Sequence, residues 1–206
     1  MTESSQKRRR PRIAAVGLAS WDRIIEVDRY PVAGSYAIVR GAASLPGGTT
    51  SNSAVTLARL GAEVALAALI GDDADGAAMR ETLEREGVDT RWLTTVAGAS
   101  TDGATVIVSS QPSDRTIFWH QGARLVRGDR LDVAAIFAHD VVILDVDDAP
   151  LRRFLVDLPA HTLPAARLLG TLTYLTDAGI PDVLAIVLRH DVFVGNRREF
   201  CAITAR

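Results

Sequence analysis

The feature that most constrains the fold is an alternation of short apolar runs and helical segments over residues 1–90. Apolar runs cover 13–16 and 64–70, and each ends in a glycine. The segment 52–60 carries apolar side chains on one face, and 72–86 begins with acidic residues, as helices prefer. Buried strands that alternate with helices are typical of a parallel sheet with helical crossovers, so the pattern predicts an α/β fold.

The rest of the chain first departs from this pattern and then returns to it. Residues 104–108 and 116–120 are rich in strand-forming side chains, and the polar stretch between them predicts a β-hairpin. A further short strand is predicted at 36–39. Beyond the hairpin, apolar strand-like runs alternate again with helical segments, the strands at 141–144, 168–175 and 192–194 and the helices at 151–158 and 182–190.

Composition excludes several classes of protein. Of the 206 residues 48% are hydrophobic and 23% are charged, which is typical of a globular domain. The formal net charge of −2 argues against nucleic acid as a partner, and no apolar run is long enough for a transmembrane helix, so we expect no membrane partner. The single cysteine, Cys201, cannot form a disulfide within the chain, and we expect a cytoplasmic location.

The N-terminus has two interpretations. A basic run at 7–10 precedes an apolar run at 13–19, which is the arrangement of a signal peptide. The apolar run is short and leads directly into Trp21 and Asp22. We therefore predict a basic, flexible tail over 1–11, followed by a single domain over 12–206 whose first strand is 13–16.

The stretch Pro46-Gly47-Gly48-Thr49-Thr50-Ser51-Asn52 stands directly before a predicted helix. Two glycines at a helix N-terminus allow a ligand to approach the backbone closely, and the amide of Asn52 can both donate and accept hydrogen bonds. The stretch lacks the lysine of a P-loop. These residues are suited to binding a polyol, although a plain turn is the alternative for Gly47 and Gly48.

Taken with Arg59-Leu60-Gly61-Ala62 and Gly71-Asp72-Asp73-Ala74-Asp75-Gly76, this stretch resembles the N-terminal signature of the PfkB/ribokinase family of carbohydrate or nucleoside kinases. Thr50 departs from the family pattern, which has Gly, Ala or Pro there. The resemblance covers nearly the whole chain but only about the N-terminal two-thirds of the family. It implies a mostly parallel central sheet flanked by helices, with a small β lid, here expected at about 35–43 and 103–120.

The resemblance also assigns roles to individual residues. Asp22, at the end of a stretch similar to the family's first strand, would accept hydrogen bonds from the acceptor hydroxyls, and Ser20 is a possible second contact. Gly47, Gly48 and Asn52 would complete the binding site for a small-molecule sugar or nucleoside. The lids of relatives often pair, so a homodimer through the β lid is a further expectation.

Nucleotide-side residues are expected near the C-terminus. Asn196 and Glu199 resemble the family's N-x-x-E motif at the end of a strand, which implies ATP as cofactor and Mg²⁺ held by Glu199 through water. The alternative is an ordinary helix cap followed by an acidic residue in the first turn.

The family's glycine-rich segment with the catalytic aspartate has no counterpart after Asn196, so the catalytic base is expected beyond Arg206. We therefore expect a PfkB-type kinase that transfers the γ-phosphate of ATP to a sugar hydroxyl but is nearly or wholly inactive as this chain. A non-catalytic sugar-binding or interaction protein is the alternative. The acidic clusters at 72–75 and 145–148 are interpreted as a helix start and a polar loop, rather than as metal sites.

Overall fold

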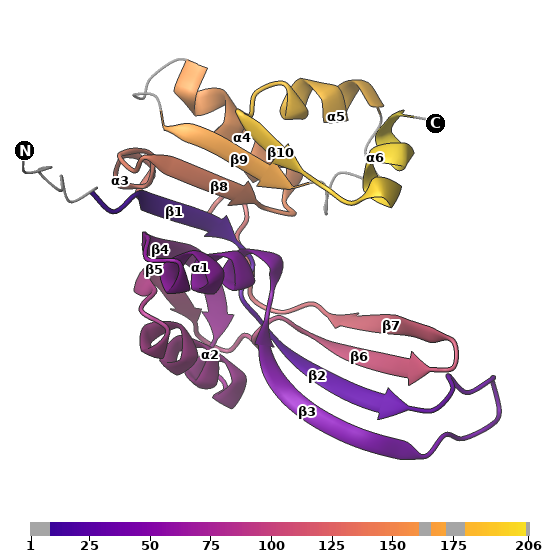
Figure 1. Ribbon diagram of the computed structural model, residues 1–206. Helices are drawn as coiled ribbons and strands as arrows, with labels where there is room; N and C mark the ends of the chain where they lie inside the picture. Colours follow the sequence, from indigo (N-terminus) through magenta and orange to yellow (C-terminus); the bar gives the residue numbers. More distant parts are fainter. Residues whose placement is uncertain (1–8, 161–165, 172–179, 205–206) are drawn as a thin grey trace, which may run out of the picture.

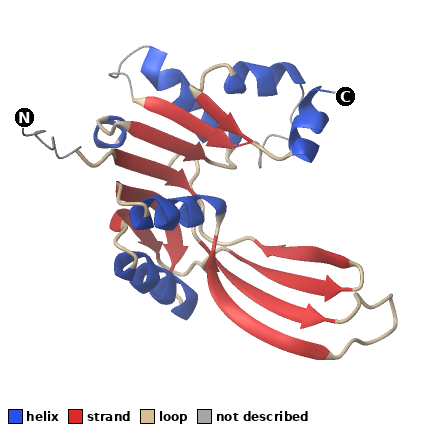
Figure 2. Ribbon diagram, viewed as in Figure 1, coloured by secondary structure: helices blue, strands red, loops and turns tan. Residues whose placement is uncertain are grey.

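The computed structural model describes residues 9–160, 166–171 and 180–204, and shows two β-sheets of different character. A six-stranded sheet with helices on both faces forms the body, and a four-stranded sheet extends from one end of it (Figures 1 and 2). The expected tail over 1–11 lies mostly outside the described residues.

The larger sheet is entirely parallel, as the strand–helix alternation predicts. Its order is β10-β9-β8-β1-β4-β5. The strands are β1 (Arg12–Gly17), β4 (Glu63–Gly71), β5 (Asp89–Val96), β8 (Val141–Asp145), β9 (Arg167–Thr171) and β10 (Val192–Val194).

The central strands β1, β4 and β8 are apolar between their ends because both faces of the sheet are covered. In β1, Ala14 and Val16 pack into one core cluster while Ile13 and Ala15 pack into the other. The helices are α1 (Thr49–Arg59), α2 (Ala74–Arg85), α3 (Val133–Phe137), α4 (Ala149–Asp157), α5 (Ile180–Val187) and α6 (Arg197–Thr204), with a 3₁₀ turn at Leu158–Ala160. Helices α1 and α2 contribute to the cluster of Ile13, and α3, α4 and α5 to that of Val16.

Local sequence sets the helix boundaries. Gly61 follows the C-cap of α1 with a φ of 93°, which only glycine adopts without strain, and the amide of Ala62 donates to the carbonyl of Leu57 in a Schellman motif. Asp73 is the N-cap of α2, and its carboxylate accepts from the Gly76 amide at 2.8 Å. The predicted helix start at 72–75 is therefore confirmed.

The smaller sheet has the order β3-β2-β6-β7. Its strands are β2 (Ser20–Val27), β3 (Val39–Gly47), β6 (Gly103–Ser110) and β7 (Ser113–His120). Strands β6 and β7 form the predicted hairpin, and β2 pairs with β6 in parallel and with β3 antiparallel. Every residue of β7 is exposed, so no second layer among the described residues covers this strand.

The structure also corrects several expectations. The strand predicted at 36–39 is wrong: the strand begins at Val39, and most of β3 is exposed, so no buried face imposed an alternating pattern. Strands β2 and β5 and helix α3 were not predicted. The end of the run predicted at 168–175 lies outside the described residues beyond 171. Over the described ranges, no helix is both long and apolar enough to cross a membrane.

Candidate functional site

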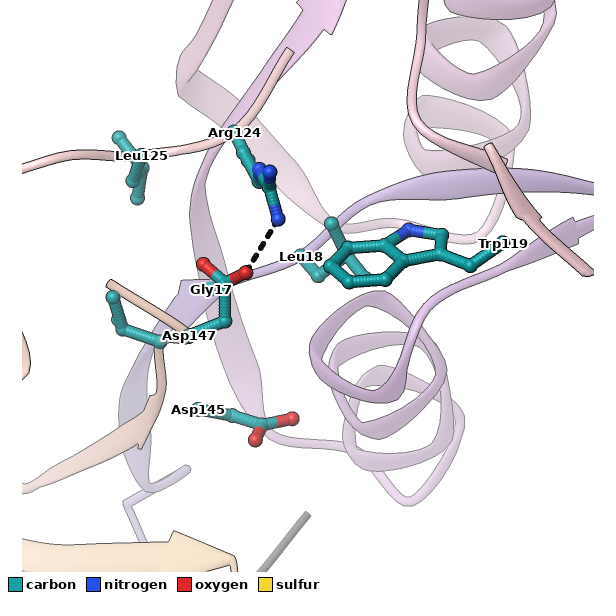
Figure 3. Close-up of a pocket in the computed structure, with 8 residues that line it drawn as sticks. Gly17, Leu18, Trp119, Arg124, Leu125, Asp145 and Asp147 are labelled. Carbon is teal, nitrogen blue, oxygen red and sulfur yellow. Dashed lines mark hydrogen bonds and ion pairs between the residues drawn. The ribbon is translucent and has the colours of Figure 1, made fainter. Parts of the chain in front are cut away.

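The main sheet changes direction beside β1. The chain passes from β1 to β4 and β5 on one side and then returns to place β8 on the other side of β1. The carboxyl ends of β1 and β8 therefore form a topological switch point, which is where open α/β sheets bind ligands. A pocket lies there (Figure 3), lined by Gly17, Leu18, Trp119, Arg124, Leu125, Asp145, Val146 and Asp147.

Thr50 ties the start of α1 to both strand ends. Its buried hydroxyl oxygen accepts from the amide of Leu18 at 3.0 Å and lies 3.4 Å from Asp145 Oδ2. A Cβ on Gly17 would lie 2.2 Å from this oxygen, so a glycine is needed at the end of β1. Thr50, which departs from the family pattern, thus connects three elements, namely β1, α1 and β8.

Asp22, Ser20 and Gly47 are brought together by the pairing of β2 with β3. Ser20 is the register partner of Gly47, and Asp22 Oδ1 accepts from the Ser20 hydroxyl at 3.2 Å and from the Ala104 amide at 3.0 Å. A Cβ on Gly47 would lie 2.0 Å from Asp22 Oδ2, so the Asp22 carboxylate occupies the space that a side chain at position 47 would need. Burial raises the pKa of Asp22 above its ordinary value, although both hydrogen bonds act in the opposite direction.

Gly48 joins β3 to α1 with a φ of 93°, in a region that favours glycine. A Cβ at this position would lie 2.7 Å from the carbonyl oxygen of Leu18. The backbone of the glycine pair therefore packs directly against the β1–β2 junction.

Asn52 is less closely associated with this group. Its side chain is exposed and lines a groove between α1 and α2, together with Pro46, rather than the pocket at the switch point. Of the predicted acceptor residues, the structure brings Ser20, Asp22, Gly47 and Gly48 together and places Asn52 at their margin.

Two buried carboxylates at the site were not predicted as site residues. Asp145, the last residue of β8, accepts from the Thr171 hydroxyl at 2.6 Å. Asp102, directly before β6, is 1% exposed and accepts from Trp119 Nε1 at 2.8 Å. Burial raises the pKa of Asp102, against the hydrogen bonds from Trp119 and Gly122 and the positive charge of Arg124. The sequence feature that could have identified Asp145 as a site residue is its position directly after an apolar run.

An arginine links the two sheets at the pocket. Arg124 Nη1 lies 2.6 Å from Asp147 Oδ2, and the guanidinium carbon lies 4.8 Å from the centre of the Trp119 ring (Figure 3). Trp119 belongs to β7 of the small sheet, whereas Asp147 follows β8 of the large sheet. The contact therefore fixes the hairpin against the switch point.

The predicted nucleotide-side residues form a reciprocal cap at the start of α6. Glu199 Oε2 accepts from the Asn196 amide at 2.8 Å, and Asn196 Oδ1 accepts from the Glu199 amide at 2.9 Å. Glu199 Oε1 makes no hydrogen bond within the described residues, so one carboxylate oxygen is available to a hydrated Mg²⁺. No group of three or more His, Cys, Asp or Glu side chains that could hold a metal ion occurs among the described residues.

Comparison with known proteins identifies the family of the chain. The sequence model of the pfkB family carbohydrate kinases matches residues 10–206. A nucleoside kinase of Methanothermobacter thermautotrophicus is 30% identical over 136 residues, covering 66% of this chain and 44% of the relative. A ribokinase of Bacillus subtilis is 32% identical over 111 residues, covering 54% and 37%. The chain therefore belongs to the pfkB family.

A solved structure supports the fold in particular. The ribokinase of Arabidopsis thaliana complexed with ribose and ATP matches with a TM-score of 0.74 at 20% identity, over 96% of this chain and 64% of that one. The expected ribokinase-like α/β fold is thus confirmed. The chain spans less than half the length of the two curated relatives described above.

Proposed function

We propose that this chain forms the acceptor-binding part of a kinase that transfers the γ-phosphate of ATP to a hydroxyl of a sugar or nucleoside. The observation that carries the proposal is the position of Asp22, held against Gly47 and Ser20 where β2 pairs with β3. Family membership supports the reaction class.

Asp22 would hold the acceptor through its hydroxyls. Its Oδ1 is already occupied by Ser20 and Ala104, whereas Oδ2 makes no hydrogen bond within the described residues. A carboxylate oxygen is a strong acceptor for hydroxyl donors, and partial burial strengthens such bonds. Ser20 would add a second contact, and Gly47 and Gly48 would let the acceptor approach the backbone, with Asn52 at the rim.

The nucleotide would bind on the side of β10. Asn196 and Glu199 lie after this strand, and their reciprocal cap holds the Glu199 carboxylate in a fixed orientation. Bound Mg·ATP would supply the phosphoryl group. The described residues would orient the acceptor hydroxyl and Glu199 would meet the hydrated metal.

We further propose that the four-stranded sheet acts as a lid over the acceptor. Trp119 of this sheet lines the pocket, and its strand β7 is exposed along its whole length. A homodimer through the same sheet is supported by its exposed apolar side chains, namely Val39, Leu45, Val108, Ile117, Phe118 and Trp119.

A thermal-shift screen with sugars and nucleosides, each with and without Mg·ATP, tests the proposal. A ligand at 100 times its dissociation constant stabilises a protein by about 2.7 kcal/mol. We expect at least one acceptor to stabilise the chain and Asp22→Ala to abolish that effect. The matched control is Asp28→Ala, which removes an exposed carboxylate from an ion pair with Arg40 at the far end of β2.

The outcomes separate the candidate functions. An equal shift in wild type and Asp22→Ala would refute the assigned role of Asp22. Stabilisation by a sugar with no effect of Mg·ATP would favour the non-catalytic sugar-binding protein over the kinase. Release of ADP that depends on the sugar would establish the transfer reaction.

A further inference from the structure

A larger cavity lies at the amino ends of the central strands, and we call it the amino-end cavity. It has a volume of about 460 Å³ and is lined by the first residues of β1, β4 and β5 and by the end of α3. Ligand pockets typically have volumes of about 300–1,000 Å³. Figure 1 shows this end of β1 beside α3, whereas the smaller sheet, which carries Asp22, extends from the other end of the strand. The amino-end cavity is therefore separate from the residues that the proposed function uses.

The segment Arg10-Pro11-Arg12 supplies two cationic side chains to the amino-end cavity. A proline favours an extended conformation of the residue before it, and side chains two apart in an extended chain lie on the same side. Two hydrogen bonds fix the backbone here: the Arg12 amide donates to Asp140 Oδ2 at 2.8 Å, and the Glu63 amide donates to the Pro11 carbonyl at 2.9 Å. Within the described residues, neither the Arg10 nor the Arg12 guanidinium forms an ion pair or a hydrogen bond.

The described lining of the amino-end cavity has a surplus of positive charge. Asp89 accepts from Arg91 Nε at 2.6 Å and from the Arg91 amide at 3.0 Å, so these two charges compensate each other. The remaining charged side chains of this lining are the carboxylate of Glu63 and the guanidinium groups of Arg10 and Arg12. Three arginines thus face two carboxylates in a chain whose formal net charge is −2. The local charge favours an anion.

His139 and Trp92 form an aromatic part of the same lining. His139 Nδ1 lies 3.0 Å from the Ala135 carbonyl oxygen, which can only accept, so Nδ1 carries the proton in the neutral ring. Its Nε2 makes no hydrogen bond within the described residues and can donate to an anion when the ring is protonated. The imidazole meets the Trp92 indole edge to face at 5.6 Å, and the Arg91 guanidinium carbon lies 5.8 Å from the centre of the same indole. Trp92 therefore holds two of the groups that would surround the anion.

We propose that the amino-end cavity binds the phosphate group of a small phosphorylated ligand, at a site distinct from that of the acceptor. Guanidinium groups keep their charge and match the geometry of phosphate oxygens. A phosphate monoester carries a charge of about −1.5 to −2 at pH 7, so one phosphate can compensate both Arg10 and Arg12, whereas one carboxylate compensates a single cation. The proposal does not rest on the proposed function. Inorganic phosphate, pyrophosphate and a sugar phosphate share this chemistry and are the three sources to distinguish.

Isothermal titration calorimetry of the whole chain with phosphate, pyrophosphate and ribose 5-phosphate tests the proposal. We expect at least one of them to bind, and the tightest identifies the source of the phosphate group. The double change Arg10→Gln with Arg12→Gln should weaken that binding at least about tenfold, because charge-assisted hydrogen bonds are lost. The matched control, Arg29→Gln with Arg115→Gln, removes the same charge from exposed positions after β2 and within β7 and should leave the affinity unchanged. Asp22→Ala should also leave it unchanged.

Three calorimetric results would overturn the proposal: no binding of any of the three ligands, wild-type affinity in a folded Arg10→Gln, Arg12→Gln protein, or an equal loss in the control pair. The last result would show a response to overall charge. In none of these cases is the proposed function affected, since Asp22 lies outside the described lining of the amino-end cavity.

Tryptophan fluorescence gives a second test that does not depend on the arginine variants. Trp92 lines the amino-end cavity, so the bound ligand should change the fluorescence of the wild-type chain. Trp92→Phe should remove that change while Trp21 and Trp119 remain. A change of the same size in Trp92→Phe would place the ligand elsewhere and overturn the proposal.

Discussion

Gly48→Ala should destabilise the protein far more than the same change at Gly61. Both glycines have a φ of 93°, so both substitutions introduce backbone strain. They differ in their surroundings: nothing lies within 4 Å of a Cβ on Gly61, whereas a Cβ on Gly48 would stand 2.7 Å from the carbonyl oxygen of Leu18. The pair therefore isolates the cost of close packing between the glycine pair and the β1–β2 junction.

The expected loss of stability is the sum of two costs, one for backbone strain and one for close packing. A non-glycine residue in such a backbone region costs about 1–3 kcal/mol. Overpacking against neighbours that cannot withdraw adds about 1–3 kcal/mol, and the Leu18 oxygen belongs to the main chain. We expect a loss of about 4 kcal/mol for Gly48→Ala and about 1–2 kcal/mol for Gly61→Ala.

Urea unfolding followed by far-ultraviolet circular dichroism gives both free energies of unfolding, with the wild type measured in parallel. The slope of the transition should be the same in all three proteins if only the native state is affected. Equal losses for the two variants would refute the argument, because they would mean that the junction moves away from the new methyl group at no cost.

Two further predictions concern Gly47 and Asp73. Gly47→Ala should weaken binding of any acceptor that depends on Asp22 by at least about tenfold, because the new Cβ displaces the Asp22 carboxylate. The same change should cost about 1–3 kcal/mol of stability, since the displaced carboxylate loses its hydrogen bonds from Ser20 and Ala104. Ligand-induced thermal shifts and urea midpoints measure the two effects, and unaltered binding would contradict the site. Burial raises the pKa of Asp73, but hydrogen bonds from the Thr101 hydroxyl and amide and other backbone amides outweigh it, so the pKa lies below its ordinary value. Such a group stabilises the fold above the unfolded pKa, about 3.9, and the stabilisation is lost as pH falls through the lower folded pKa. The stability difference between wild type and Asp73→Asn should hold from pH 7 to about pH 5 and shrink below about pH 4; a difference independent of pH would show that the charge is irrelevant.

Complete burial made β4 predictable from the sequence, whereas the exposed hairpin of β6 and β7 was predicted from its strand-forming side chains on either side of a polar stretch. The run 64–70 is apolar without interruption because β4 is covered on both faces, and Gly61 and Gly87 close the two helices on either side of it with positive φ. Strand β3 has mostly small, exposed side chains, and β2 is only partly buried, so neither has a pattern from which its bounds could be predicted.

The candidate site likewise contains some residues that the sequence predicts and others that it does not. Ser20, Asp22 and Gly47 were predicted from two short motifs, and the structure pairs the strands that carry them. The contributions of Trp119 and Arg124 depend on how the second sheet is placed against the first. No local pattern encodes that placement, so these residues emerged only from the structure.

The chain passes between its two sheets at one place. Leu18 and Ala19 lead from β1 into β2, Gly48 leads from β3 into α1, and hydrogen bonds join these crossings to Asp102, since the Trp21 amide donates to the Asp102 carbonyl at 2.8 Å. These crossing segments join the smaller sheet to the larger one, and they also form walls of the pocket. A tilt of the smaller sheet would consequently change the shape of the pocket, and a ligand that fills the pocket would also set the angle between the sheets.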